Sequence, residues 1–319
     1  MSQAEVWTIK ALLDWTIPFL QKKGSESPRL EAEILLAFAL DKTRVELYVS
    51  YDDVPSEDAR GKFRELVRRR SLGEPVAYLV GNKEFYSLKF DVDSRALIPR
   101  PETEQLVLEV VEYVKKNDNL FGKRSADEET ETDENEKTTP CADARRICEV
   151  GVGSGCVSVA LAKHVPNVRV LALDVSEDAL NVARDNAVKH SVDDKIEFLA
   201  SDLFQAVDAA SSEFAPPFDI IVSNPPYVSE PEYAALSPTV REFEPRVALV
   251  GGPTGAELAL ELVDQAPDLL KSGGKLYLEL SPTTVEAVAE RVRTDARWQE
   301  TRGFADFARL PRYIEATRK

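Results

Sequence analysis

The sequence predicts an α/β protein: a parallel β-sheet with helices on both faces, preceded by a smaller helical domain. From about residue 146 to the C-terminus, apolar segments of strand length alternate with longer segments that have apolar residues at helical spacing. This alternation is typical of parallel sheets, because the crossover between two parallel strands usually contains a helix. Before residue 73 the apolar spacing is that of short helices. We therefore expect two domains of unequal size.

The composition argues against several classes of protein. With 319 residues, 43% of them hydrophobic and 30% charged, the chain can form one large or two modest globular domains. No apolar run approaches the ~18 residues of a membrane helix, and the acidic N-terminus does not look like a signal peptide. The three cysteines lack metal-ligand spacing and only two histidines are present, so we expect no metal site and no histidine catalysis. A net charge of −16 argues against broad nucleic-acid binding. We expect a cytoplasmic protein without membrane contact.

Residues 1–83 are expected to form the helical domain. Segments near residues 7–20, 28–38 and 57–71 have the apolar spacing of helices that are buried on one face. Ser56 is expected to cap the third helix. The three arginines at residues 68–70 suit the end of a helix on a solvated face, and we favour this over contact with an RNA-rich partner.

Residues 84–100 are expected to form a hairpin that links the two domains. Residues 85–92 alternate between apolar and polar side chains, as a half-buried strand does, and we expect them to pair with residues 95–98. The second domain, residues 101–319, then begins with a helix at Pro101.

An acidic segment, residues 117–144, interrupts this second domain. Residues 127–136 are mostly Asp and Glu and include no side chain that could join a core. We expect a disordered surface insertion here rather than a docking tail.

Strand and helix patterns then follow one another to the end of the chain. The expected strands are residues 146–150, 168–173, 195–199, 218–222 and 275–280, with two short ones near 298–301 and 313–316. The expected helices are residues 155–164, 176–189, 254–270 and 283–292. In such sheets ligands bind beyond the carboxyl ends of the strands.

The first strand of this domain runs into a glycine turn, Gly151-Val152-Gly153-Ser154-Gly155, which opens a helix. Glycines let the backbone approach a ligand, and the N–H groups of the helix start face it. Asp174, at the end of the next strand, is placed to bind both hydroxyls of a ribose, so the pair indicates an adenosine-containing ligand. A dinucleotide-binding turn has glycine where this chain has Cys156, and Glu149 suits an ammonium better than a pyrophosphate. We therefore favour S-adenosylmethionine over a dinucleotide.

The third strand ends in Ser201-Asp202-Leu203-Phe204. Asp202 could accept a hydrogen bond from an adenine amino group, and Leu203 or Phe204 could cover the ring. A plain helix cap with a neighbouring apolar residue explains the same residues equally well.

The fourth strand ends in Asn224-Pro225-Pro226-Tyr227. The two prolines stiffen the turn and have no N–H, so bare carbonyls and the Asn224 amide can accept hydrogen bonds from one –NH2 group. Tyr227 offers a flat ring beside them. The turn therefore suits a planar amide or an exocyclic amine, although an ordinary loop ended by two prolines would look the same.

This combination of motifs resembles the amino-methyltransferases of the class I fold. Four further segments resemble the release-factor glutamine methyltransferases: Gly73-Glu74-Pro75-Val76-Ala77-Tyr78, Phe85-Tyr86, Ile98-Pro99-Arg100-Pro101-Glu102-Thr103-Glu104 and Glu244-Pro245-Arg246. The match covers nearly the whole chain apart from the acidic insertion. It implies a Rossmann-like, seven-stranded methyltransferase sheet with a small N-terminal helical domain for substrate recognition.

The resemblance also implies a reaction. Members of this family transfer a methyl group from S-adenosylmethionine to the amide nitrogen, N5, of the glutamine in the Gly-Gly-Gln loop of peptide-chain release factors, leaving S-adenosylhomocysteine. Residues 151–155, Asp174 and Leu203 would bind the cofactor, and residues 224–227 the glutamine, with Asn224 next to both. The chain departs from the family at Ser281-Pro282, where relatives usually have a glycine and then a glutamine. We expect a monomer that binds a protein substrate.

An amide nitrogen is a poor nucleophile, and the motif contains no suitable base, so we expect catalysis by positioning. The Asn224 side-chain oxygen and the Pro225 carbonyl would accept the two amide hydrogens, and Tyr227 would pack on the amide plane. Three alternatives remain: a glutamine of a ribosomal protein, adenine N6 of DNA or RNA, and a non-catalytic adenosine-binding module. The net charge of −16 disfavours adenine N6 of DNA or RNA as the substrate.

Overall fold

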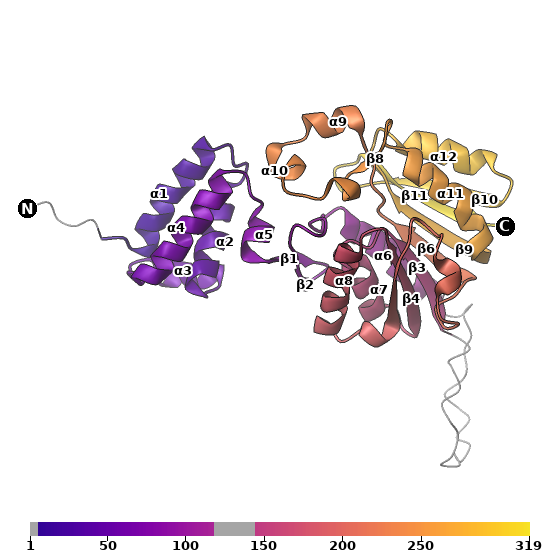
Figure 1. Cartoon of the computed structure of the whole chain (residues 1–319), viewed down its shortest axis with the longest axis horizontal. Coiled ribbons are helices and arrows are strands. Elements are labelled where there is room, and N and C mark those ends of the chain that lie inside the picture. The colour runs from indigo at the N-terminus through magenta and orange to yellow at the C-terminus, as the bar shows by residue number, and fades with distance from the viewer. Residues whose placement is uncertain (1–5, 118–143) are drawn as a thin grey trace, which may run out of the picture. The chain divides into compact units, whose positions relative to one another are not determined.

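The computed structural model describes residues 6–117 and 144–319, so most of the expected acidic insertion lies outside the described residues. The chain divides into two compact units (Figure 1). The first contains Met1–Asn82 and a later segment, Ser237–Phe243. The second contains Lys83–Leu236 and Glu244–Lys319.

The first unit is helical. Its helices are α1 (Ile9–Lys22), α2 (Pro28–Leu40), α3 (Arg44–Val49), α4 (Glu57–Ser71), α5 (Val76–Val80) and, from the later segment, α10 (Pro238–Arg241). The apolar faces of the first helices share one core, in which Leu13, Leu35 and Leu66 are buried. Ser56 caps α4 as expected, because its hydroxyl accepts a hydrogen bond from the backbone N–H of Ala59 at 3.2 Å.

The arginines at the end of α4 each form an ion pair within this unit. Arg68 pairs with Glu65 in the same helix. Arg70 pairs with Glu31 of α2 at 2.9 Å, with both side chains largely buried, so it holds two helices together. Arg70 therefore stabilises this unit, beyond any effect on the helix dipole.

The hairpin is formed by different residues from those expected. Strands β1 (Asn82–Phe85) and β2 (Leu88–Asp91) pair, whereas residues 95–98 form no strand. The chain turns at Tyr86 and Ser87, whose φ angles of 50° and 60° are those of a two-residue hairpin turn. The sequence hides this turn, because Tyr86 and Ser87 continue the alternation of the flanking strands.

The second unit is built on a seven-stranded sheet, which confirms the predicted α/β fold. Its strands are β3 (Arg145–Val150), β4 (Val168–Asp174), β5 (Ile196–Ala200), β6 (Phe218–Ser223), β9 (Leu270–Glu279), β10 (Trp298–Ala305) and β11 (Pro311–Arg318). The order is β10-β11-β9-β6-β3-β4-β5. Strands β3, β4, β5, β6 and β9 are parallel, as expected. At one edge β11 runs antiparallel to both neighbours, because the link from β10 is too short for a crossover.

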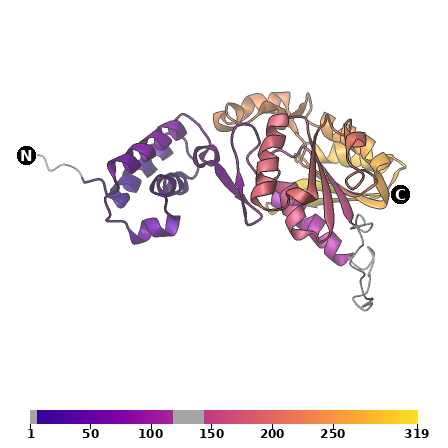
Figure 2. The same cartoon turned by 60° about the horizontal axis from the view of Figure 1, so that its bottom comes forward.

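Helices cover both faces of this sheet (Figures 1 and 2). On one face lie α6 (Thr103–Lys116), α7 (Cys156–His164) and α8 (Glu177–Lys189), and on the other α11 (Glu257–Leu269) and α12 (Val285–Thr294). The apolar residues of α11 and α12 share a core with alternate residues of the strands, such as Leu171, Ile221 and Leu276. None of the described helices is both long enough and apolar enough to cross a lipid bilayer.

The remaining elements are short. They are α9 (Glu230–Ala235), β7 (Val228–Ser229), β8 (Val250–Gly252) and three 3₁₀ turns at Asp193–Lys195, Val207–Ala209 and Arg246–Ala248. The small sheet of β7 and β8 was not expected from the sequence, and it supports the loop that follows β6.

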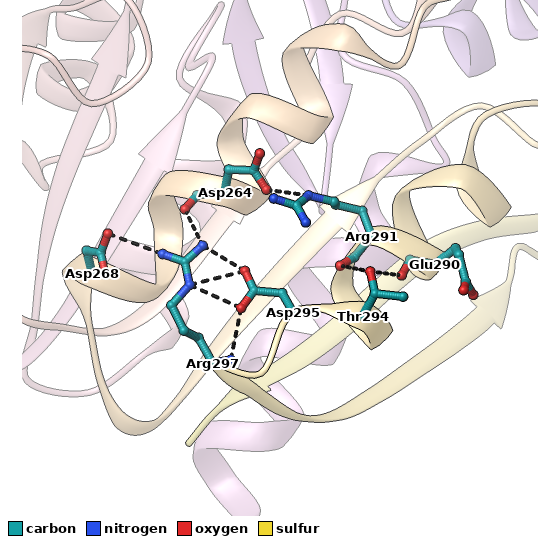
Figure 3. A network of polar contacts seen from close by, with 7 residues as sticks. All are labelled: Asp264, Asp268, Glu290, Arg291, Thr294, Asp295 and Arg297. Atoms are coloured by element: carbon teal, nitrogen blue, oxygen red, sulfur yellow. Dashed lines mark hydrogen bonds and ion pairs between the residues drawn. The ribbon is translucent and has the colours of Figure 1, made fainter.

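A polar network fastens the turn between α12 and β10 to α11 (Figure 3). The Arg297 guanidinium donates to the Asp295 carboxylate and, at 2.8 Å, to the backbone carbonyl of Asp264. Arg291 of α12 donates to the Asp264 carboxylate at 2.7 Å. These contacts fix the two helices on this face relative to each other.

Candidate active site

A cavity of about 280 Å³ lies beyond the carboxyl ends of β3, β4, β5 and β6. This is where a parallel sheet binds its ligands. The cavity is lined by nearly all the residues predicted for the cofactor and the substrate: Glu149, Gly151, Val152, Gly153, Ser154, Asp174, Asp202, Leu203, Asn224, Pro225 and Pro226. Gly155 and Tyr227 do not line it.

The glycine turn after β3 requires glycine for its conformation and its packing. Gly151, Gly153 and Gly155 have φ angles of 79°, 55° and 80°, in the left-handed region. A Cβ atom on Gly155 would also lie 2.9 Å from the Cβ of Ala183 in α8. Gly155 therefore lets α7 and α8 pack closely while the rest of the turn borders the cavity.

Asp174 is held rigidly at the end of β4. One carboxylate oxygen accepts from the N–H of Gly153 at 2.8 Å, and the other from the N–H of Ser176 at 2.9 Å. Burial raises the pKa of Asp174, and these backbone hydrogen bonds oppose that rise. Each oxygen keeps a lone pair for a further donor, so the carboxylate can still accept two hydroxyl groups.

Glu149 places a buried carboxyl group at the cavity. It is 3% exposed and accepts a hydrogen bond from the Ser158 hydroxyl. Burial raises the pKa of Glu149 to about 8. Among the described residues no basic side chain is a cause of the Glu149 pKa shift, so a cationic group in the cavity would meet a buried carboxyl without a counter-charge.

In the turn after β5, Ser201 rather than Asp202 caps the backbone. The Ser201 hydroxyl donates to the carbonyl of Leu203 at 2.8 Å and accepts from the N–H of Ala206 at 3.0 Å. Asp202 is exposed and borders the cavity, as does Leu203, which has a φ angle of 48°. Leu203 and Phe204 both belong to the core below, but only Leu203 also lines the cavity, so it is the apolar side chain available to cover a ring.

Asn224 is oriented by a residue that the sequence analysis did not single out. The side-chain Nδ2 of Asn224 donates to Oγ1 of Thr103, the first residue of α6, at 3.0 Å. Ser223 just before it donates to the carbonyl of Val150 at 2.6 Å, which ties the ends of β6 and β3 together. Asn224 lines the cavity, and its side-chain oxygen takes no part in the hydrogen bond to Thr103.

Tyr227 follows the two prolines and contacts the end of β9. Its ring is outside the cavity lining, and its hydroxyl lies 3.4 Å from Oε1 of Glu279, at the end of β9. Burial raises the pKa of Tyr227 above its usual range. Tyr227 therefore anchors the loop to the sheet.

A second glycine segment, residues 250–255, packs against the loop after β6. A Cβ on Gly251 would overlap the carbonyl oxygen of Pro226, and one on Gly255 would overlap that of Tyr227. The sequence offered a signal here, since Gly-Gly-Pro-Thr-Gly is an unusual start for a helix, but the sequence analysis did not use it.

Two of the segments that resemble the family, residues 98–104 and 244–246, meet beside this cavity. Glu244, which is 5% exposed, accepts from the Arg100 guanidinium at 2.6 Å and from the backbone N–H of Ile98 at 3.2 Å. The Tyr313 hydroxyl donates to the carbonyl of Glu102 at 2.7 Å. These contacts fasten the segment that precedes α6. The described residues include no group of three or more His, Cys, Asp or Glu side chains arranged to hold a metal ion.

Comparison with known proteins agrees with this arrangement. Residues 11–81 match the PrmC N-terminal domain model, and residues 113–241 match the methyltransferase small domain model. The hMettl16 catalytic domain, 16% identical with a TM-score of 0.50, covers 80% of this chain and 82% of its own length, and shows a similar fold.

Two curated relatives are similar along most of their length. A release factor glutamine methyltransferase of Rhodopirellula baltica is 46% identical over 276 residues, which cover 86% of this chain and 84% of that protein. One of Chlorobaculum tepidum is 41% identical, over 88% of this chain and 87% of that protein. The resemblance indicated by the motifs is confirmed, and the chain belongs to the release factor glutamine methyltransferase family.

Proposed function

We propose that this protein methylates the side-chain amide nitrogen, N5, of the glutamine in the Gly-Gly-Gln loop of peptide-chain release factors. Its membership of the family makes it an S-adenosylmethionine-dependent methyltransferase. The observation that carries the substrate assignment is the Asn224 amide, whose NH2 group donates to the Thr103 hydroxyl oxygen. Its oxygen is left to accept a hydrogen bond from an amide in the cavity.

The cavity residues fit S-adenosylmethionine. Glu149 would bind its ammonium, Asp174 its ribose hydroxyls, and Asp202 and Leu203 its adenine, while the turn at residues 151–155 would lie along it. The buried, unpaired Glu149 supports this assignment, because a carboxyl group there is costly without a cationic partner. When bound, the cofactor supplies a methyl group on a cationic sulfur.

The residues of this chain would act by holding the substrate amide. The Asn224 oxygen and the Pro225 carbonyl would each accept one of its two hydrogens, which fixes the direction of the nitrogen lone pair. The same two acceptors would stabilise the positive charge that develops on the nitrogen. Tyr227 would pack on the amide plane, and its hydroxyl would keep the loop in place through Glu279.

We also propose that the chain acts as a cytoplasmic monomer, on protein rather than on nucleic acid. The net charge of −16 supports the choice of a protein substrate, because it disfavours contact with a phosphate backbone.

Mass spectrometry can test the substrate assignment. The protein would be incubated with labelled S-adenosylmethionine and, separately, a release factor, a ribosomal protein and an oligonucleotide. We expect one methyl group on the glutamine of the Gly-Gly-Gln loop and none on the other two substrates. Methylation of the ribosomal protein alone, or of adenine, would overturn the proposal.

A further inference from the structure

Arg100 is a basic residue of the cavity lining that the proposed mechanism does not use. It lies on the segment that leads to Thr103, whose hydroxyl contacts Asn224. The side chain of Arg100 is 30% exposed, so a ligand in the cavity can reach it. Because a guanidinium only donates hydrogen bonds, such a ligand must offer an acceptor.

A buried carboxylate fixes the Arg100 guanidinium. Nη2 of Arg100 donates to Oε1 of Glu244 at 2.6 Å, and the Glu244 side chain is 2% exposed. The other oxygen of Glu244 accepts from the backbone N–H of Ile98 at 3.2 Å. Since both oxygens are bound, the carboxylate has little freedom to turn, and it sets the direction of the guanidinium.

The other N–H groups of Arg100 are left for a ligand. A guanidinium has five N–H groups, and in the described part of the chain Glu244 is the one acceptor of a hydrogen bond from Arg100. Arg95 also lines the cavity, but it is paired with Asp93 through both Nε and Nη2. Arg100 is therefore the arginine of this lining with donors to offer.

Arg100 lies on the side of the cavity proposed for the substrate. Thr103 contacts Asn224, and Pro245, which follows the carboxylate partner of Arg100, also lines the cavity. Burial raises the pKa of Tyr227, and the Arg100 charge is among those that oppose this rise. Since Asn224 and Tyr227 belong to the proposed substrate turn, we associate Arg100 with the substrate rather than with the cofactor.

The charge of Arg100 favours a neutral acceptor. Arg100 and Glu244 together form a neutral pair, so an anionic ligand would gain little net attraction from it. A peptide carbonyl can accept a charge-assisted hydrogen bond without disturbing this balance. A Gly-Gly-Gln loop is rich in such carbonyls, and glycine allows another group to approach them closely.

We propose that Arg100 binds the main chain of the polypeptide substrate next to the glutamine, through a peptide carbonyl oxygen, and that Glu244 positions its guanidinium. This inference rests on the proposed function, because it needs a polypeptide in the cavity. Arg100 would hold that polypeptide in the ground state and in the transition state alike. Its loss should therefore raise KM for the protein substrate more than it lowers kcat.

The test compares Glu244→Gln with a double variant, Glu244→Gln plus Arg100→Met, in the full chain. The glutamine can still accept hydrogen bonds from Ile98 and Arg100, so neither variant leaves a buried charge without a partner. The two differ only in the guanidinium. Relative to Glu244→Gln, the double variant should raise KM for a release factor by about 10–100-fold, as for the loss of a hydrogen bond to a charged group. Its kcat and its cofactor affinity should stay within about 3-fold.

A matched pair elsewhere in the fold provides the control. Arg297 and Asp295 are 39% and 10% exposed, form an ion pair and lie outside the cavity lining (Figure 3). Asp295→Asn with and without Arg297→Met should give the same KM for the release factor. An effect of Arg297→Met as large as that of Arg100→Met would contradict a specific role for Arg100.

Four further results would overturn the inference. They are an equal KM in the two Glu244→Gln variants, a loss confined to kcat, a lower cofactor affinity, which would assign Arg100 to the cofactor carboxylate, and a KM effect that disappears at high salt, which would indicate an anionic partner. If the double variant does not fold, Arg100→Lys decides, because it keeps the ion pair without the planar fork and should raise KM by about 10-fold.

The inference and the proposed function can fail separately. If wild type methylates the release factor and the double variant has the KM of Glu244→Gln, the inference alone fails. If wild type methylates a ribosomal protein but not the release factor, the proposed substrate fails, and the same comparison with the ribosomal protein decides the role of Arg100.

Discussion

The side-chain nitrogen of Asn224 lies 3.0 Å from the hydroxyl oxygen of Thr103, a residue 121 positions earlier in the chain. Asn224 follows β6, and Thr103 begins α6. A carboxamide has an NH2 group that donates hydrogen bonds and an oxygen that accepts them. A contact that fixes one of these groups therefore decides which group faces the cavity. In this protein an acceptor is offered to the cavity, which suits a substrate that brings an NH2 group.

Cofactor binding should release a proton near neutral pH. Glu149 has its pKa raised to about 8 by burial, so it is mostly protonated in the free protein at pH 7. A bound ammonium would favour the ionised form and lower this pKa, so affinity should rise with pH up to about 8 and then level off. Calorimetry at pH 7 in buffers of different ionisation enthalpy measures the proton release. Glu149→Gln should abolish it, and binding heats that do not depend on buffer in wild type would refute the assignment.

The two buried glutamates should also make the cofactor-free protein less stable as pH rises. The pKa values of Glu149 and Glu279 are raised to about 8 and about 7 from an ordinary 4.5. The folded state therefore holds more protons than the unfolded state in this window, and the free energy of unfolding falls as pH rises from about 4.5 to about 8. Denaturant unfolding at several pH values measures the slope. Glu149→Gln with Glu279→Gln should flatten it, and an equal slope in this double variant would contradict the explanation.

Asp174 should contribute mainly to cofactor affinity. Its charge-assisted hydrogen bonds to the ribose would be made in the ground state and in the transition state alike. Asp174→Ala should therefore cost roughly 2–4 kcal/mol of binding, at about 1.5–3 kcal/mol for each hydrogen bond to a charged group with partial rescue by water. Calorimetry gives the affinity, and the unfolding midpoint shows whether the glycine turn still folds. Unchanged affinity would remove Asp174 from the site.

Gly251 should be needed for the shape of the loop after β6. A Cβ at Gly251 would overlap the Pro226 carbonyl oxygen, so Gly251→Ala should displace the substrate loop, slow methyl transfer and cost roughly 1–3 kcal/mol of stability. Gly303→Ala is the matched control, because the nearest atom to its Cβ would be the Tyr313 carbonyl oxygen at an ordinary 3.8 Å. Thermal unfolding and single-turnover rates compare the two. Equal effects of the two changes would contradict the role given to Gly251.

The sequence predicts the parallel strands and their helices well, because buried strands and one-sided helices have distinct periods. It also predicts that the glycine turn and Asp174 lie together, since β3 and β4 are neighbouring parallel strands. The partner of Asn224 could not be predicted, because Thr103 reaches it only through tertiary packing. The hairpin was misplaced for a local reason: Tyr86 and Ser87 adopt left-handed angles that neither residue type favours.

The most direct test of the central claim is the rate of methyl transfer by Asn224→Ala. The Asn224 oxygen would stabilise positive charge that appears only as the nitrogen reacts, so its loss should affect turnover more than binding. From the cost of removing one preorganised polar group, we predict single-turnover methylation of a release factor slowed by on the order of 10²–10³-fold. Cofactor affinity should change little. Methylation by Asn224→Ala at close to the wild-type rate would contradict the amide-positioning mechanism, even with the fold and cofactor correct.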